Sequence, residues 1–213
     1  TADAGGGFTS ASLFAGSGTP AAANGDLNTV AITAGANIQT ANIFAASDVR
    51  LVAPGTITAG TVNAFDVLAL GGGAISLGSL GAVNRVLIAD DAMAAPAFAA
   101  GGFDKELVFA ATPLATSGTI AMSGTANVGS IRGETSASIL TGDINANGTI
   151  GFASGGNGQY GALRNVGGNI NLIARSGGIT LTTANLPGFF LASGSTGVNV
   201  GSVFARDIAL LST

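Results

Sequence analysis

The sequence predicts an all-β chain: one right-handed parallel β-solenoid with turns, or rungs, of about 18–21 residues. The first observation is a weak internal repeat. Residues 36–55, 56–73 and 74–91, written above one another, place small and branched apolar residues in shared columns. The columns are Ile38, Ile57 and Ile75; Ile43, Val62 and Leu80; Ala45, Ala64 and Ala82; and Val49, Val67 and Val86. Their spacing is 57 − 38 = 19 and 75 − 57 = 18, which is typical of a solenoid.

The second observation is the composition. The chain has 213 residues, 47% of them hydrophobic and only 8% charged, with 35 Gly and no Cys, Trp or His. This length can bury a sizeable core, and the high hydrophobicity excludes disorder. The longest apolar stretches are interrupted before the roughly 18 residues that a membrane span needs. The net charge of −4 and the scattered basic residues indicate no nucleic-acid partner.

The third observation is a pattern of short strands separated by turn residues. Residues 1–26 predict an irregular edge or cap, or the end of an earlier rung. Residues 27–89 contain short runs in which apolar residues recur at every second position. Gly, Asn, Asp and Pro separate these runs, and this pattern predicts rungs. Residues 90–105 interrupt the pattern and predict an insert inside a rung, because 106–110 resembles 85–89.

The remaining chain resumes the rungs over 106–152, with a Gly-rich excursion at 153–165 and further rungs over 166–213. The segment 198–210 matches 57–69 in its apolar columns and in its aspartate, which indicates that the repeat extends to the C-terminal part. We therefore expect a single stack over 1–213. A lone rung cannot bury its apolar side, so neighbouring rungs must stack to form the core.

The motifs GNINLIARSGGITLT (168–182) and TITAGTVNAFDVLAL (56–70) resemble the repeats of filamentous-haemagglutinin-like exoproteins and autotransporter passengers. The resemblance covers 27–90 and 118–213. It implies a right-handed parallel β-helix from an extracellular bacterial surface protein. No Asn-Pro-x-Gly secretion motif and no outer-membrane barrel segment accompany it, so the export route stays open.

Two groups of charged residues are candidate sites. The adjacent pair Asp90–Asp91 could perform acid–base work on a glycan, although a solvated turn is the simpler interpretation. Asp48, Asp66, Arg85 and Glu106 share a column and predict an alternating charge ladder, with a cation site at Asp48 and Asp66 as the functional alternative. The sequence has no His to act as general base, so we expect no enzyme and no cofactor or metal.

Two further patterns have structural interpretations. The Gly-rich pieces 71–73 and 155–158 lack the GxxxxGK[ST] pattern of a phosphate loop and predict turns. Thr56 with Thr58 and Thr180 with Thr182 form Thr-x-Thr pairs, which bind ice when they recur in every rung; here they do not recur.

The strand alternation predicts an outward apolar surface. If Val67 and Ala69 point inward, Leu68 and Leu70 point outward, and exposed rows of this kind are covered by something. The predicted interaction surface comprises Leu68, Leu70, Leu87, Val108, Phe189 and Phe190. Its cover could be the 90–105 insert, the N-terminal segment or another copy.

These observations predict a structural or adhesive extracellular protein of the bacterial surface or of a fibre, as a non-catalytic fragment of a larger exoprotein. Its partners would be other copies, neighbouring parts of a longer chain, or host or matrix glycans, without membrane insertion. A self-assembling filament or surface-layer subunit and a glycan-active β-helix enzyme are the alternatives.

Overall fold

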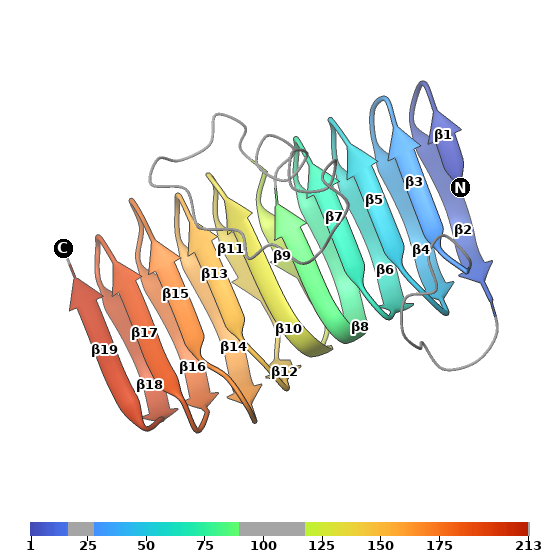
Figure 1. The fold of residues 1–213 in the computed structure, drawn as a ribbon. Helices are drawn as coiled ribbons and strands as arrows, with labels where there is room; N and C mark the ends of the chain where they lie inside the picture. Colours follow the sequence, from blue (N-terminus) through green and yellow to red (C-terminus); the bar gives the residue numbers. More distant parts are fainter. Residues whose placement is uncertain (17–27, 90–117, 213) are drawn as a thin grey trace, which may run out of the picture.

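The computed structural model describes residues 1–16, 28–89 and 118–212. Within these ranges the regular structure is entirely β, and the parallel strands stack into a β-solenoid of about eight turns. Figure 1 shows the strands side by side from β1 to β19, with the two termini at opposite ends of the row. The predicted fold class is therefore confirmed.

Within each described range the strands follow one another with short bends between them. Their bounds are β1 Ala2–Ala4, β2 Phe8–Ala15, β3 Val30–Ala34, β4 Ile38–Ala45, β5 Val49–Ala53, β6 Ile57–Ala64, β7 Val67–Gly71, β8 Ile75–Ala89, β9 Ile120–Met122, β10 Ala126–Thr135, β11 Ile139–Thr141, β12 Ile144–Ala146, β13 Ile150–Ser154, β14 Gly158–Asn165, β15 Ile170–Ala174, β16 Ile179–Asn185, β17 Phe189–Gly194, β18 Val198–Phe204 and β19 Asp207–Ser212.

The register divides each rung into three short segments, which we call walls 1, 2 and 3. In the rung that starts at residue 57 they are residues 57–59, 61–64 and 67–71. Strand β6 carries walls 1 and 2 around one bend, β7 carries wall 3, and β8 runs through all three walls of the next rung. The four predicted apolar columns pair in this register, and their members are buried.

The repetition of segment 57–69 in segment 198–210 is also confirmed. The ladder that begins at Ile57 in wall 1 continues rung by rung to Val198. The ladder that begins at Val67 in wall 3 continues to Ile208. The two matched segments therefore occupy equivalent places in different rungs.

Three boundaries differ from the sequence prediction. Of the two alternatives for residues 1–26, the irregular edge is wrong and the earlier rung agrees with the structure: the segment contains two ladder strands, β1 and β2, because Phe8 and Leu13 fill the columns of Ile38 and Ile43. The predicted excursion at 153–165 also lies in the stack, within β13 and β14.

The third difference concerns the rung that follows β8. Arg85–Ala89 pairs with Ser130–Glu134, so the place predicted for 106–110 is occupied by β10. Residues 90–117, including the predicted insert, lie outside the described residues.

Two aromatic residues fill core space that nearby glycines leave open, Gly133 in the rung before Phe152 and Gly158 in the same strand as Tyr160. Phe152 and Tyr160 are buried with their rings stacked, the centroids being 5.5 Å apart. A β-carbon on Gly133 would lie 2.8 Å from Cδ1 of Phe152, and one on Gly158 would lie 2.6 Å from the Tyr160 hydroxyl. Complete burial raises the pKa of the Tyr160 hydroxyl far above its usual range.

The bend between walls 1 and 2 brings successive backbones close together. A β-carbon on Gly60 would lie 2.2 Å from the carbonyl oxygen of Ala41, and one on Gly78 would lie 2.4 Å from that of Gly60. Gly142, Gly161 and Gly201 face the same restriction in later rungs. In these rungs a side chain would have to displace neighbouring atoms, so glycine fits the close approach of the backbones.

Candidate functional site

A row of side chains extends along the outer side of wall 2. The register places one residue of the row in each rung, parallel to the solenoid axis. In order they are Phe14, Phe44, Asn63, Gly81, Asn127, Asn145, Arg164, Asn185 and Phe204. We call this the amide row. Four amides and one guanidinium thus lie between phenyl rings at both ends.

The middle of the amide row lines an open groove of about 810 Å³. Six members of the row, from Phe44 to Arg164, border the groove. Val83 and Val166, at the bend between walls 2 and 3, also line it, and they are 52% and 73% exposed. The groove therefore combines polar amides with apolar sides.

Side-chain hydrogen bonds order the central part of the groove. The Nδ2 atom of Asn145 donates to Oδ1 of Asn127 at 2.9 Å, and the Arg164 guanidinium lies 3.5 Å from Oδ1 of Asn145. The guanidinium also faces the Asp143 carboxylate at 3.8 Å. Both side chains of this ion pair are about half exposed, so the pair is weak but leaves little net charge in the groove.

Gly81 interrupts the amide row within the groove. A β-carbon at this position would lie 2.2 Å from Oδ1 of Asn63, so the Asn63 amide extends over the space next to the glycine. At the N-terminal end the rings of Phe14 and Phe44 stack at 5.3 Å with an interplanar angle of 7°. Phe14 is 72% exposed.

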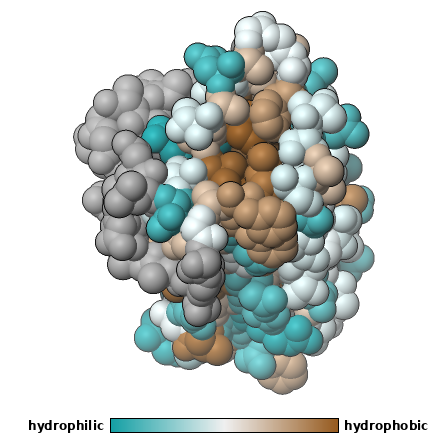
Figure 2. Space-filling view, turned by 90° about the vertical axis from the view of Figure 1, so that its right-hand side faces the viewer, coloured by the Kyte–Doolittle hydropathy of each residue, from teal (hydrophilic) through white to brown (hydrophobic). Residues whose placement is uncertain are grey.

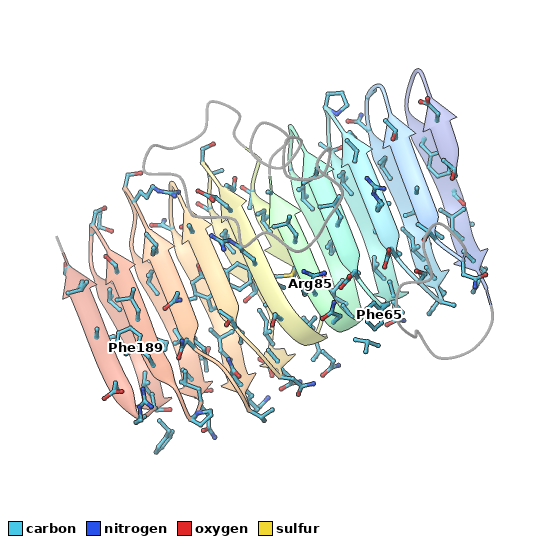
Figure 3. The ribbon with its side chains drawn as sticks, viewed as in Figure 1. Phe65, Arg85 and Phe189 are labelled. Carbon is cyan, nitrogen blue, oxygen red and sulfur yellow. The ribbon has the colours of Figure 1, made fainter. Side chains whose placement is uncertain are left out.

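The predicted charge column lies at the bend between walls 2 and 3. The Arg85 backbone N–H donates to Oδ1 of Asp66 at 2.8 Å, and the Arg85 guanidinium is 3.5 Å from Oδ2. Figure 3 shows Arg85 and Phe65 at this edge of the stack. The ion pair expected from the sequence is present, whereas Glu106 lies outside the described residues.

The same corner places the carboxylates of Asp48 and Asp66 in successive rungs. Burial raises the pKa of Asp48, and the neighbouring Asp66 charge raises it further. Burial also raises the pKa of Asp66, against the opposing effects of the Arg85 N–H and guanidinium. Oδ1 of Asp48 is buried without a hydrogen-bond partner. Since each carboxylate accepts an N–H from the next rung, the arrangement is that of a turn cap.

We expect the Asp48→Asn variant to be more stable than the wild type near pH 7, by about 0.5 kcal/mol. A carboxyl with a raised pKa in the folded state binds its proton more tightly there than in the unfolded chain. Its ionisation therefore destabilises the fold as pH rises past the unfolded value, and the asparagine removes this term.

Denaturant titrations at pH 3 and pH 7 measure this difference. The gain should shrink towards zero at pH 3, where both forms of residue 48 are neutral. An equal gain at both pH values would contradict an ionisation effect. Asp3→Asn, at the N-terminal end of the stack, is the control.

A more deeply buried ion pair lies at wall 3. The Arg175 guanidinium contacts Oε1 of Glu134 at 2.6 Å, and their side chains are 14% and 6% exposed. Glu134 is in β10 and Arg175 follows β15, so the pair links positions two rungs apart. Sequence reasoning missed it because 41 residues separate the partners.

The predicted outward leucines belong to a second, smaller apolar cluster. Leu68, Leu70 and Ala89 form a buried cluster separate from the main core, with Val52 and Leu87 packed against it. Val67 and Ala69 belong to the main core, so the expected alternation of inward and outward residues is present.

The prediction for Phe190 is wrong. Phe190 pairs with Ile170 and Ile208 in the inward column of wall 3, and its side chain is 0% exposed. Phe189, labelled in Figure 3, is half-buried at the start of β17, and its N–H donates to Oδ1 of Asn169. Val108 lies outside the described residues, and Arg132 follows Leu87 in its column.

The other sequence candidates take no part in the groove. The pair Asp90–Asp91 lies outside the described residues. The glycines at 72–73 and 155–156 form bends whose N–H groups donate to carbonyls of the preceding rung. The outer neighbours of Thr58 are Gln39 and Ser76, and those of Thr180 are Gln159 and Asn199, so these threonines form no ladder.

The amide row was not found from the sequence. Its signal was a polar residue directly after an inward residue of wall 2 in several rungs, as in Val62-Asn63 and Ile144-Asn145. That signal becomes visible only once the register across residues 81 to 127 is known.

Comparison with known proteins identifies no relative: no family model, curated protein or solved structure matches this chain. Within the described ranges no helix is long and apolar enough to cross a membrane. In the same ranges no three acidic, His or Cys side chains gather as they would around a metal ion.

Proposed function

We propose that this chain is a rigid rod segment of a bacterial surface or extracellular fibre protein, and that it acts in adhesion without catalysis. The observation that carries the proposal is the uninterrupted core. Buried side chains form one cluster from Val30 in β3 to Ala192 in β17, and parallel ladders connect every rung along it. Each rung is held by its two neighbours, and this arrangement suits a stiff, elongated support.

The corners strengthen the same support. Asn37, Asn157 and Asn169 each accept a backbone N–H from the next rung through Oδ1, at 2.8–2.9 Å. Asp143 does the same for Ala162. These bonds satisfy backbone donors where the ladder bends. The polar residues of the turns therefore serve the rod, and the outer side of wall 2 is left as the surface for contact.

Bead attachment under flow tests the adhesive function. Beads carrying the oriented chain should be retained on surfaces coated with matrix polysaccharide or matrix protein, and beads carrying the heat-unfolded chain should not. Retention no greater than that of uncoated beads on every surface would refute adhesion.

The two ends of the stack favour a second candidate, a self-assembling filament or surface-layer subunit. Figure 2 views the end with β1 and β2 and shows apolar residues gathered at its centre. At the other end Ile208, Leu210 and Leu211 of β19 are about half exposed. Apolar ends and strand edges without a partner favour the addition of further strands.

Sedimentation velocity at several concentrations distinguishes the filament from the single rod. A filament subunit should sediment faster as concentration rises, and Leu211→Lys should suppress the change. A constant monomer across the whole range would reject this second candidate.

A further inference from the structure

We propose that the groove along the amide row binds a neutral, unbranched glycan chain lying parallel to the solenoid axis. The inference rests on the proposed adhesive function for its biological role, and it names the class of ligand that the rod would hold. Its physical basis is the chemistry of the groove itself, which is formed by described residues of six successive rungs.

The amides match the hydroxyl groups of sugars. A primary amide offers two N–H donors and a carbonyl acceptor, and a hydroxyl group both donates and accepts. Asn145 donates one N–H to Oδ1 of Asn127 and accepts from Arg164, which fixes the two amides and leaves both N–H donors of Asn127 and the second one of Asn145 for a ligand. Asn63 presents its Oδ1 over the gap at Gly81. A hydroxyl-rich ligand could therefore be held at several successive rungs.

The sides of the groove suit the apolar faces of sugar rings. Val83 and Val166 lie along one side, and Phe44 closes the N-terminal end. The stack of Phe44 on Phe14 extends the apolar surface beyond the groove. Exposed valine and phenylalanine side chains next to amides provide both contacts that a sugar needs: hydrogen bonds to its hydroxyls and burial of its C–H surface.

The groove argues against a peptide strand or an anion as ligand. Its floor is the side-chain face of a sheet, where the backbone groups already pair in the ladders, so a strand cannot be added by backbone hydrogen bonds. Its one cation, Arg164, already faces Asp143. A neutral ligand fits this charge balance better than a phosphate or an acidic chain.

The length of the groove favours a polymer. Five rung steps separate Phe44 from Arg164, and strands in a sheet lie about 4.8 Å apart. The groove thus extends for about 24 Å with similar groups at each step. A chain of repeating sugar units can contact such a row several times, whereas a single sugar would contact only one or two rungs.

Calorimetric titration of the purified chain tests the proposal, with cellohexaose and chitohexaose as neutral probes and hexagalacturonate as the charged comparison. At least one neutral probe should bind, and the charged one should bind more weakly. The double variant Asn127→Ala/Asn145→Ala should lower the affinity about 10-fold or more, since it removes hydrogen bonds each contributing about 1 kcal/mol. Gly81→Gln, whose side chain would compete with the Asn63 amide for space in the groove, should act in the same direction.

The control is Asn199→Ala, an exposed asparagine of wall 1, which should bind like the wild type. Thermal unfolding of every variant shows whether its fold is intact. No binding of either neutral probe at millimolar concentration would overturn the inference, as would equal binding by the double variant. Glycan binding at the groove without bead retention would refute the adhesive function alone. Bead retention without glycan binding would refute this inference alone.

Discussion

Truncating the buried ring of Phe152 should destabilise the solenoid by about 3–5 kcal/mol. The Phe152 side chain is 0% exposed and lies at the middle of the stack, between Gly133 and Leu172 in its column. Alanine would remove most of the side chain and leave a cavity that two rungs would have to close. Denaturant unfolding followed by circular dichroism measures the loss. Phe14→Ala, at a ring 72% exposed, is the matched control and should change stability little.

Gly133 packs against the Phe152 ring and provides a second test of this contact. In the wild type, Gly133→Ala would place a methyl group 2.8 Å from Cδ1 of Phe152, so we expect a destabilisation of about 1–3 kcal/mol. In the Phe152→Ala background the same methyl group would enter the cavity, and its effect should vanish or become stabilising. The double-mutant cycle should therefore show a coupling of at least about 1 kcal/mol. Additive effects would contradict the packing of this ring against the glycine.

Removing the Arg175 side chain should destabilise the fold by about 3–5 kcal/mol. Arg175→Ala would leave the Glu134 carboxylate, whose side chain is 6% exposed, buried without its guanidinium partner. A buried carboxylate that loses this ion-pair partner is destabilised by more than the loss of the attraction alone. Thermal and denaturant unfolding at pH 7 measure the effect.

The double variant Glu134→Leu/Arg175→Met distinguishes a lost partner from lost packing. It removes both charges and keeps most of the volume, so its stability should return close to that of the wild type. Arg206→Ala, which breaks a pair with side chains 74% and 56% exposed, should have little effect. If the double variant were as unstable as Arg175→Ala, the unpaired charge would not be the cause.

The inward columns could be predicted from the sequence because they obey a simple rule. Ile38, Ile57 and Ile75 recur at nearly constant spacing and each must face the core, so apolar type and period together identify them. The capping role of Asp66 is less visible in the sequence. It depends on a carboxylate reaching the backbone N–H of a residue 19 positions away, and aspartate alone does not distinguish a cap from a ligand.

The candidate site could not be predicted because it consists of outward residues, which the core does not constrain. Asn63 and Asn127 belong to one row only because Gly81 pairs with both of them, and the second pairing follows a gap of 127 − 81 = 46 residues. The prediction that the Gly-rich run at 153–165 leaves the stack was wrong for a related reason. The Ile column contains Gly158 at this rung, and the neighbouring Tyr160 ring occupies the space that its side chain leaves open.

The spacing between Ile75 and Ile120 has a consequence for how such a molecule can change. These residues pair directly although 120 − 75 = 45 positions separate them, whereas the other successive members of the same column from Ile38 to Val198 lie 18 to 21 positions apart. The ladder thus depends on which side chains meet and not on the length of chain between them. A foreign sequence inserted in the chain between the rungs of Ile75 and Ile120 should leave the alignment of the rungs intact. For the same reason, whole rungs are natural units for duplication. The chain between these two rungs is therefore a suitable place to graft an epitope or a second binding module onto the rod.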